Sequence, residues 1–284
     1  MKRILMTLAL AALALPVLAQ PQLRKDNIDE VLKAMTLEEK ATLVVGSSRG
    51  MTQLAGITMS ASLIVPGAAG TTQSIPRLGI PNTVVHLGWA SDLLYDDKAA
   101  EEVYFSRNMA FIRELIPTME KTGVMVLVEN TTHANMGDRW YLYTGDEMKD
   151  FLRYADHPLL GACWDTGHAN AEGHQYTDLT ALGGDLRAIH FNDNRGGGDE
   201  HVMPYLGTMS VDEVMCGLRD SGYRGVFTFE CDSSARPADY WQGNRRRWRE
   251  ERIAEPPLAV QEALERALYL CGEAILTAYG YPVE

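Results

Sequence analysis

The chain has 284 residues, of which 46% are hydrophobic and 23% are charged, and its net charge is −12 at pH 7. This length and apolar content exclude a globally disordered chain and suffice for one large α/β barrel or two modest domains. Residues 1–82 carry 8 Lys/Arg and 5 Asp/Glu (net +3), whereas residues 83–284 carry 18 and 33 (net −15). An acidic surface repels phosphate backbones, so we expect no nucleic-acid partner.

The first 19 residues have the pattern of a secretory signal peptide. Lys2 and Arg3 precede an apolar stretch over residues 4–15, and Ala19 offers a cleavage site. Because this stretch is shorter than the ~20 residues of a membrane-spanning helix, we predict no membrane span. The signal pattern favours a periplasmic or secreted location.

The cysteines point to a different cellular origin. All four fall on predicted core strands or helices, which is typical of buried free thiols and not of a disulfide framework. They are Cys163, Cys216, Cys231 and Cys271. Because free thiols suit a reducing compartment, this part of the chain indicates a cytoplasmic ancestry.

Residues 20–82 are predicted to be mostly helical and irregular. Apolar residues at helical spacing indicate helix over residues 26–45, and the pair Thr36 and Glu39 is typical of a cap that opens a second helix there. Residues 46–76 are rich in Gly, Ser, Thr and Ala and are interrupted by Pro. We predict a loop with a short hairpin for this stretch.

From residue 83 onward, short apolar runs alternate with helical patterns. We predict strands at residues 83–87, 124–128, 160–164, 186–191 and 225–229, and helices at residues 98–122, 145–155, 211–221 and 257–279. Such alternation is typical of a parallel sheet. About five βα units are present, whereas a closed barrel of this type has eight. The predicted fold is therefore an α/β, partial TIM-type barrel that follows a foreign N-terminal segment.

A side chain able to bind metal stands at the end of four of these strands. The four residues are Glu129, Asp165, His190 and Glu230. Because the carboxyl ends of parallel strands open at one mouth of a barrel, we expect the four side chains to converge. Three carboxylates and one imidazole suit a divalent cation, with Mn, Mg, Co and Zn all open. The alternative for any one of them is a structural role as a helix cap or ion-pair partner.

Five further residues near the strand ends are candidates for substrate or metal binding. His168 follows the third strand and either faces the same mouth or bonds to a loop. Asp199 and His201 come after three consecutive glycines, in either a mobile loop that closes over substrate or a solvated turn. His86 ends the first strand and is a possible additional ligand. Arg195 is a candidate for binding a substrate hydroxyl or phosphate.

Residues 1–82 resemble the N-terminus of a family-three glycoside hydrolase of the β-glucosidase type. The resemblance rests on residues 26–40, 65–72 and 75–81. The Asp-Gly-Pro segment and the nucleophilic Asp of that family do not follow in this sequence. The resemblance therefore assigns no hydrolase residue here. It implies a division into a signal peptide (1–19), a β-glucosidase-like fragment (20–82) and a fused C-terminal part (83–284).

Residues 83–281 resemble the xylose-isomerase-like TIM barrel superfamily, which contains sugar phosphate isomerases, ketose epimerases and the endonuclease-four type. Four motifs carry the resemblance: Val-Glu-Asn-Thr (128–131), Trp-Asp-Thr-Gly-His (164–168), Ile-His-Phe-Asn-Asp (189–193) and Phe-Thr-Phe-Glu (227–230). It implies that the four strand-end residues are metal ligands and that His168 faces the substrate or a second metal. It also matches Asp199-Glu200-His201 to the Asp-x-His loop of the multi-metal members.

The resemblance matches only the last five βα units of the barrel. An open barrel exposes strand edges and apolar helix faces, both of which favour association, so a homo-oligomer is expected.

Together these features predict a divalent-metal-dependent isomerase or epimerase acting on a sugar or sugar-like ketone. Glu129 and Glu230 lie on non-adjacent strands, so they flank a substrate and transfer a proton through an enediolate. A metal-assisted hydride shift uses much the same ligands. Three other readings stay open: a glycoside-hydrolase-derived fragment, an endonuclease-four-type metal phosphodiesterase and an inactive fusion.

Overall fold

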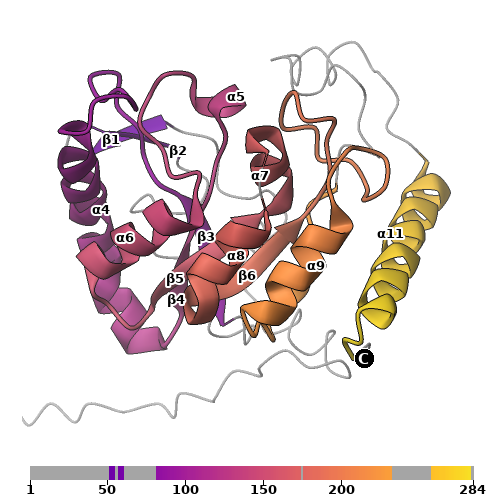
Figure 1. Cartoon of the computed structure of the whole chain (residues 1–284). Coiled ribbons are helices and arrows are strands. Elements are labelled where there is room, and N and C mark those ends of the chain that lie inside the picture. The colour runs from indigo at the N-terminus through magenta and orange to yellow at the C-terminus, as the bar shows by residue number, and fades with distance from the viewer. Residues whose placement is uncertain (1–50, 55–56, 61–80, 174, 232–256, 283–284) are drawn as a thin grey trace, which may run out of the picture.

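The computed structural model describes residues 51–54, 57–60, 81–173, 175–231 and 257–282. Its centre is a sheet of five parallel strands whose spatial order, β3-β4-β5-β6-β7, repeats their order in the chain (Figure 1). The strands are β3 (Asn82–His86), β4 (Met125–Glu129), β5 (Leu160–Asp165), β6 (Leu186–Phe191) and β7 (Phe227–Phe229). The predicted partial TIM-type barrel is thereby confirmed.

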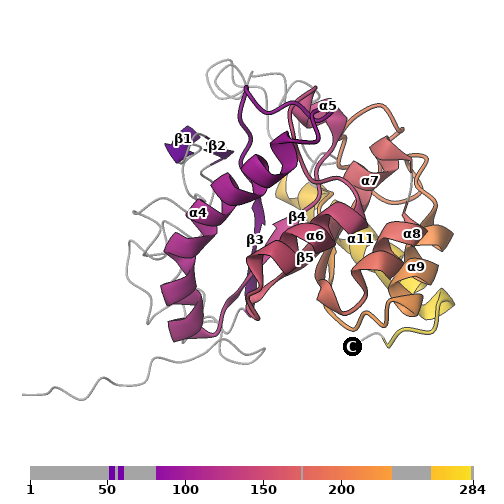
Figure 2. The same ribbon diagram turned by 60° about the vertical axis from the view of Figure 1, so that its left-hand side comes forward.

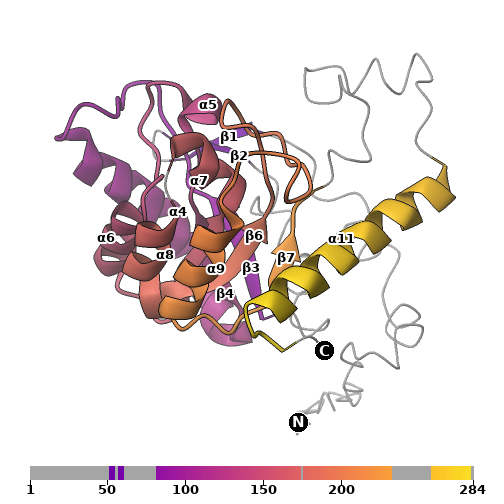
Figure 3. The ribbon, with the colours of Figure 1, turned by 45° about the vertical axis from the view of Figure 1, so that its right-hand side comes forward.

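One long helix or a group of short helices follows each strand and covers the outer face of the sheet (Figure 2). The long helices are α4 (Ala100–Thr122), α6 (Gly145–Ala155), α9 (Val211–Asp220) and α11 (Leu258–Ala278). Between β5 and β6 lie α7 (Thr166–Glu172), α8 (Tyr176–Leu182) and the short 3-10 helix η2 (Gly183–Asp185). Figure 3 shows α11 running beside β7, where Gly272 packs against the ring of Phe229.

Side-chain caps fix where several helices begin. Thr144 and Glu147 form a capping box at α6, in which each side chain accepts a hydrogen bond from the other residue's backbone N–H. Ser210 caps α9 by accepting from the N–H of Glu213. Asp165 caps α7, so the residue that ends β5 also starts the next helix. These caps place the helix starts at the mouth of the barrel.

The hydrophobic core lies between the sheet and the outer helices. Alternate residues of β4, β5 and β6 point outward into it, while the residues between them face the concave side. The buried outward residues are Val126, Val128, Ala162, Trp164, Ile189 and Phe191. They pack on helix residues that include Ile112, Phe151, Leu179 and Val214. This alternation leaves the concave face at the strand ends to polar side chains.

Two helical segments after β5 were not predicted. α7 and α8 have 7 residues each, too few to display a clear amphipathic period. α7 forms because Asp165 caps it and because its first turn is buried. The four-residue helix α5 (His133–Met136), which Thr132 caps, was also missed.

Little of the N-terminal prediction falls on described residues. An antiparallel pair, β1 (Met51–Leu54) and β2 (Ile57–Ser60), confirms the short hairpin expected within residues 46–76. The predicted signal peptide and the helices over residues 26–45 lie outside the described residues. Within the described part of the chain, no helix combines the length and apolarity that crossing a bilayer requires.

Candidate metal centre

The four strand-end residues meet at the carboxyl edge of the sheet. Each of Glu129, Asp165, His190 and Glu230 offers one ligand atom, and these atoms lie within 4.8 Å of one another. Strand register produces this convergence, because Asp165 is the direct partner of His190 and paired residues of parallel strands project from the same face. The register of β6 and β7 pairs His190 with Thr228, and Glu230 follows two residues later on the same face.

The ring of His190 lies between two carboxylates. Its Nδ1 is 2.8 Å from Oε1 of Glu129 and 2.9 Å from Oε2 of Glu230. Nε2 of His86 is 3.4 Å from the other oxygen of Glu129. Glu129 is buried, with 5% of its surface exposed, whereas Glu230 is partly open to solvent. The two carboxylates share one ring nitrogen of His190. A cation bound between them would interact with both carboxylates at once.

Asp165 is fully buried and held on every side. Its Oδ1 accepts from the backbone N–H of His168 at 2.7 Å, and its Oδ2 accepts from Nδ2 of Asn192 at 2.7 Å. The side chain of Asn130 binds the backbone of Asp165 twice: its Oδ1 accepts from the N–H, and its Nδ2 donates to the carbonyl. Asn130 and Asn192 therefore position the ligands although neither was singled out in the sequence. The available signal was that each follows a strand-end ligand by one or two residues.

Burial and neighbouring charges shift the pKa values of the acidic groups in opposite directions. Burial disfavours the charged form of Glu129, but the charge of His86 and the hydrogen bond from His190 outweigh it and lower the pKa of Glu129 to about 2. Burial raises the pKa of Asp165 to about 7, against the opposing effect of His168. For Glu230, the hydrogen bond from His190 overcomes the effect of burial and lowers the pKa.

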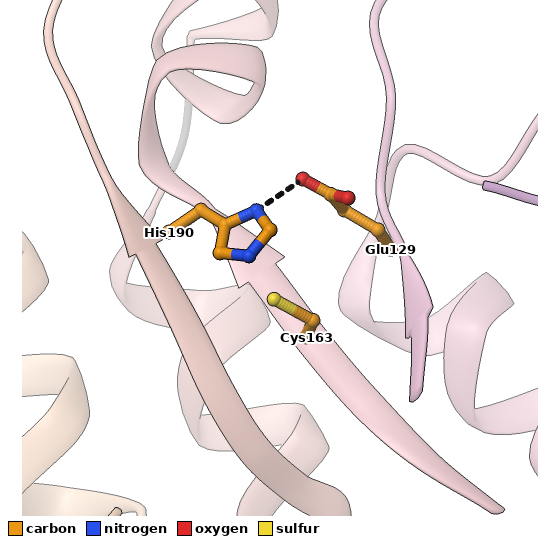
Figure 4. Close-up of side chains that lie close together, drawn as sticks. All are labelled: Glu129, Cys163 and His190. Atoms are coloured by element: carbon orange, nitrogen blue, oxygen red, sulfur yellow. Dashed lines mark hydrogen bonds and ion pairs between the residues drawn. The ribbon is translucent and has the colours of Figure 1, made fainter. Parts of the chain in front are cut away.

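The same interactions keep His190 protonated. Burial disfavours the imidazolium form, but hydrogen bonds with Cys163 and Glu129 outweigh it and raise the pKa of His190. Cys163 is the register partner of Glu129 and lies below the ring on the concave face (Figure 4). Burial raises the pKa of this thiol to about 12.

A second group of potential ligands lies beside the first. It consists of His168, Asp199 and His201, whose ligand atoms lie within 4.8 Å of one another. Nε2 of His168 is 3.3 Å from Oδ2 of Asp199, and Nε2 of His201 is 2.7 Å from Oδ1. Asn135 donates to the same carboxylate at 3.1 Å. Despite the opposing effect of burial, the charges of Asp165 and Asp199 raise the pKa of His168 to about 10.

Asp193 holds the loop that carries Asp199 and His201. Its carboxylate accepts from the backbone N–H groups of Tyr205, Gly207 and Met209, and its backbone exchanges two hydrogen bonds with Val202. The loop is thus tied to the end of β6 at several points.

Arg195 belongs to neither group of potential ligands. Its side chain is 69% exposed, and its guanidinium forms a 2.7 Å ion pair with Glu200. The backbone N–H of Arg195 also donates to the Glu200 carboxylate. The side chain of Arg195 therefore lies along its own loop, where it pairs with Glu200, and does not reach the strand ends.

The fold and the strand-end ligands define a parallel barrel protein with a candidate metal centre at its mouth. A family model described as xylose isomerase-like TIM barrel matches residues 75–252. The chain belongs to this family. An uncharacterized protein of Sinorhizobium fredii, y4fM, is 27% identical over 154 residues, which are 54% of this chain and 48% of that protein. The chain spans about half the length of the curated relatives it matches.

Two solved structures show the same fold. The structure of L-ribulose 3-epimerase aligns with a TM-score of 0.54 and 15% identity, covering 80% of this chain and 75% of the epimerase. The structure of a D-tagatose 3-epimerase-like protein aligns with a TM-score of 0.50 and 23% identity, covering 65% of this chain and 69% of that protein. No comparison supports a glycoside hydrolase segment, and the boundary near residue 82 stays a prediction.

Proposed function

We propose that the protein is a divalent-metal-dependent isomerase or epimerase that acts on a sugar or sugar-like ketone. The observation that carries the proposal is the convergence of Glu129, Asp165, His190 and Glu230 at one edge of the sheet. The two structural neighbours named above, both 3-epimerases or epimerase-like proteins by name, support the reaction class.

The donor set fits a divalent cation. Three carboxylates and one imidazole are the oxygen and nitrogen ligands that Mn²⁺, Mg²⁺, Co²⁺ and Zn²⁺ accept. Glu129 and Glu230, whose pKa values are lowered, give the site negative charge, and one proton shared with His190 compensates for it only in part. A cation bound by these four residues would polarise the carbonyl of a ketone and its neighbouring hydroxyl.

Glu129 and Glu230 are then the proton-transfer residues. They reach the centre from β4 and from the end of β7, with β5 and β6 between them. A substrate held between the two groups loses the proton next to its carbonyl to one of them as carboxylate, and the other, in its protonated carboxylic acid form, returns a proton to the enediolate. We also assign a substrate hydroxyl to His168, whose Nδ1 lies 2.9 Å from the carbonyl of Asn130 and whose Nε2 lies 3.3 Å from Asp199.

Conversion of ketoses in D₂O tests the proposal. The full chain is loaded with Mn²⁺ and incubated with a panel of ketohexoses and ketopentoses, and NMR follows the products. We expect a new epimer or isomer that carries deuterium at the carbon where the proton was exchanged. Glu129→Gln and Glu230→Gln should each lower the rate at least about 100-fold, because general acid-base groups typically contribute that much.

Glu114→Gln is the control, since Glu114 is exposed on α4 away from the strand ends. Conversion without deuterium in the product would contradict proton transfer and favour a hydride shift. If the metal-loaded chain converts no ketose in the panel, the proposed reaction class is wrong.

A second candidate function is metal-dependent phosphodiester hydrolysis. The proximity of His168, Asp199 and His201 to the first group favours it, because multi-metal phosphodiesterases need adjacent ligand sets. The net charge of −12 opposes a polyanionic substrate. Metal analysis of the zinc-loaded chain and an assay with an aryl phosphodiester decide between the two functions. The isomerase proposal would be replaced if the chain binds more than one zinc ion, if Asp199→Asn lowers that number, and if the phosphodiester is cleaved.

A further inference from the structure

The last helix, α11, buries little of its apolar surface. Of its described side chains, only those of Gly272 and Ile275 are buried. Figure 3 shows the beginning of the helix standing away from the sheet. Because a helix in a protein is stabilised mainly by packing of its apolar face, a helix of 21 residues with so little cover has apolar surface to spare for a partner.

The uncovered apolar residues of α11 form one stripe along the helix. They recur at alternating intervals of three and four residues, so they lie on one side of the helix. Val260 and Leu270 are 45% and 46% exposed, and the alanines between and after them are exposed or half-buried. The exposed stripe of α11 consists of Val260, Ala263, Ala267, Leu270 and Ala274.

This spacing is the heptad pattern of paired helices. In such pairs, apolar residues at the heptad positions a and d interlock with those of the partner helix. Val260, Ala267 and Ala274 take position a, and Ala263 and Leu270 take position d. The small alanines allow the two helix axes to approach closely. The stripe therefore fits another helix with the same spacing of small and large residues.

A second copy of α11 in the antiparallel direction has that spacing. Across a two-fold axis, Ala267 lies opposite Leu270 of the partner subunit, and Ala263 lies opposite Ala274 of the partner subunit. Each contact then occurs twice, as in any interface formed by the same surface on both copies. Small residues thus face small ones at the ends of the stripe, and a large residue faces a small one at its centre.

The charged residues beside the stripe favour the same arrangement. Arg266 and Glu273 both take position g, which flanks the apolar seam. In an antiparallel pair, g of one helix faces g of the other, so Arg266 lies opposite Glu273 of the partner subunit. In a parallel pair, g faces e, where this chain has Leu264 and Cys271. Only the antiparallel pair forms these ion pairs.

We propose that two copies of this chain form a symmetric dimer in which their α11 helices pack antiparallel through the exposed stripes. The inference does not depend on the proposed function, because it uses no residue of the candidate metal centre. A contact between two helices of this length is at the small end of specific interfaces, so the expected dissociation constant is about 1–100 μM.

Sedimentation equilibrium of the full chain, over concentrations on both sides of that value, tests the dimer. Leu270→Glu places two carboxylates at the centre of the seam and should weaken the dimer at least about 100-fold, because charges left unpaired in an interface cost several kcal/mol. Val103→Glu is the matched control, since Val103 is an exposed apolar residue of α4. It should leave the dissociation constant unchanged. Thermal unfolding checks that both variants are folded.

A charge exchange tests the antiparallel direction. Arg266→Glu sets Glu against Glu of the partner subunit, and Glu273→Arg sets Arg against Arg. Each should weaken the dimer about tenfold, because like charges placed together across an interface repel. The double variant with both changes restores opposite charges at both positions, and its dissociation constant should return to within about threefold of that of the unchanged chain.

Three outcomes overturn the inference. A chain that stays monomeric at all concentrations leaves the stripe to a different partner or to another segment of the same chain. A dimer that Leu270→Glu and Val103→Glu affect equally uses a different surface. A double variant that stays as weak as the single variants excludes the antiparallel pairing of Arg266 and Glu273.

Discussion

At the scale of single residues, Asp165 is the fully buried carboxylate of the candidate centre. Both of its carboxylate oxygens accept hydrogen bonds from protein donors, and Asn130 holds its backbone. One of those donors, Asn192, packs against Gly167 in the first turn of α7. The position of a ligand thus depends on a glycine that carries no chemistry of its own.

Gly167→Ala should therefore weaken the centre. A Cβ at this position would overlap Oδ1 of Asn192, so the asparagine that donates to Asp165 must move. We expect metal affinity to fall about 10- to 100-fold, as for other changes to groups that orient ligands. Overpacking should also lower the free energy of unfolding by about 1–3 kcal/mol. Mn²⁺ titration and urea denaturation measure the two effects.

Gly184→Ala is the matched control, because nothing lies within 4 Å of a Cβ built at that glycine. It should leave Mn²⁺ affinity unchanged. Equal losses of affinity in the two variants would show that Asn192 does not position Asp165.

Metal affinity should rise with pH. Hydrogen bonds with Cys163, Glu129 and Glu230 raise the pKa of His190, so a cation that binds at Nδ1 must displace the proton held there. Below the raised pKa, one displaced proton strengthens apparent binding by about tenfold per pH unit. Calorimetric Mn²⁺ titrations at pH 6, 7 and 8, in buffers of different ionisation enthalpy, measure both the affinity and the protons released. A flat profile with no proton release would contradict a shared proton at Nδ1.

At the scale of secondary-structure elements, the sequence predicted every strand of the parallel sheet to within two residues. All five are short, mostly apolar runs, and β4 and β5 are buried on both faces, which leaves them few alternatives. The segment after β5 was harder to interpret, because Gly167 and Gly173 interrupt the helical pattern of α7. That helix depends on its cap and its packing, which a single sequence does not display.

The convergence of the candidate residues was predictable to a similar depth. The strand ends identified Glu129, Asp165, His190 and Glu230, because parallel strands bring their carboxyl ends together. Asn192 and Cys163 were not identified as parts of the site. A cysteine inside an apolar strand resembles an ordinary core residue, and only the strand register shows that it faces His190. Contacts of this kind arise from pairing between distant segments, so local patterns do not contain them.

The capping box of α6 should contribute measurably to stability. Thr144 accepts from the N–H of Glu147, and Glu147 accepts in return from the N–H of Thr144. Thr144→Ala leaves the first of these N–H groups without its acceptor, so we expect a loss of about 0.5–2 kcal/mol in the free energy of unfolding. Urea denaturation measures it. Thr144→Ser keeps the hydroxyl and should lose much less, and equal losses would assign the effect to packing of the methyl group.

At the scale of the whole molecule, the candidate centre joins strands that are otherwise linked only through their neighbours. Glu129 from β4 and Glu230 after β7 are drawn to one point by His190 on β6. A bound cation would therefore tie together most of the sheet and stabilise the folded chain as a unit.

Added Mn²⁺ should raise the midpoint of thermal unfolding, and EDTA should reverse the change. At a hundredfold excess over its Kd, a ligand that binds only the folded state stabilises it by about 2.7 kcal/mol. For a domain of this size that corresponds to a shift of about 5–10 °C. Differential scanning calorimetry of the full chain measures it. Asp165→Asn should abolish most of the shift, whereas a shift retained in that variant would place the bound ion elsewhere.

The order of the strands has a consequence for synthesis. Each strand from β4 to β7 pairs with the strand that the ribosome has delivered just before it. The sheet can therefore grow in the same direction as translation. When each of these strands is synthesised, the strand it pairs with already exists. The candidate metal centre is the exception, because Glu230 comes from the last of these strands. The nascent chain thus acquires its sheet progressively and its complete ligand set only at the end.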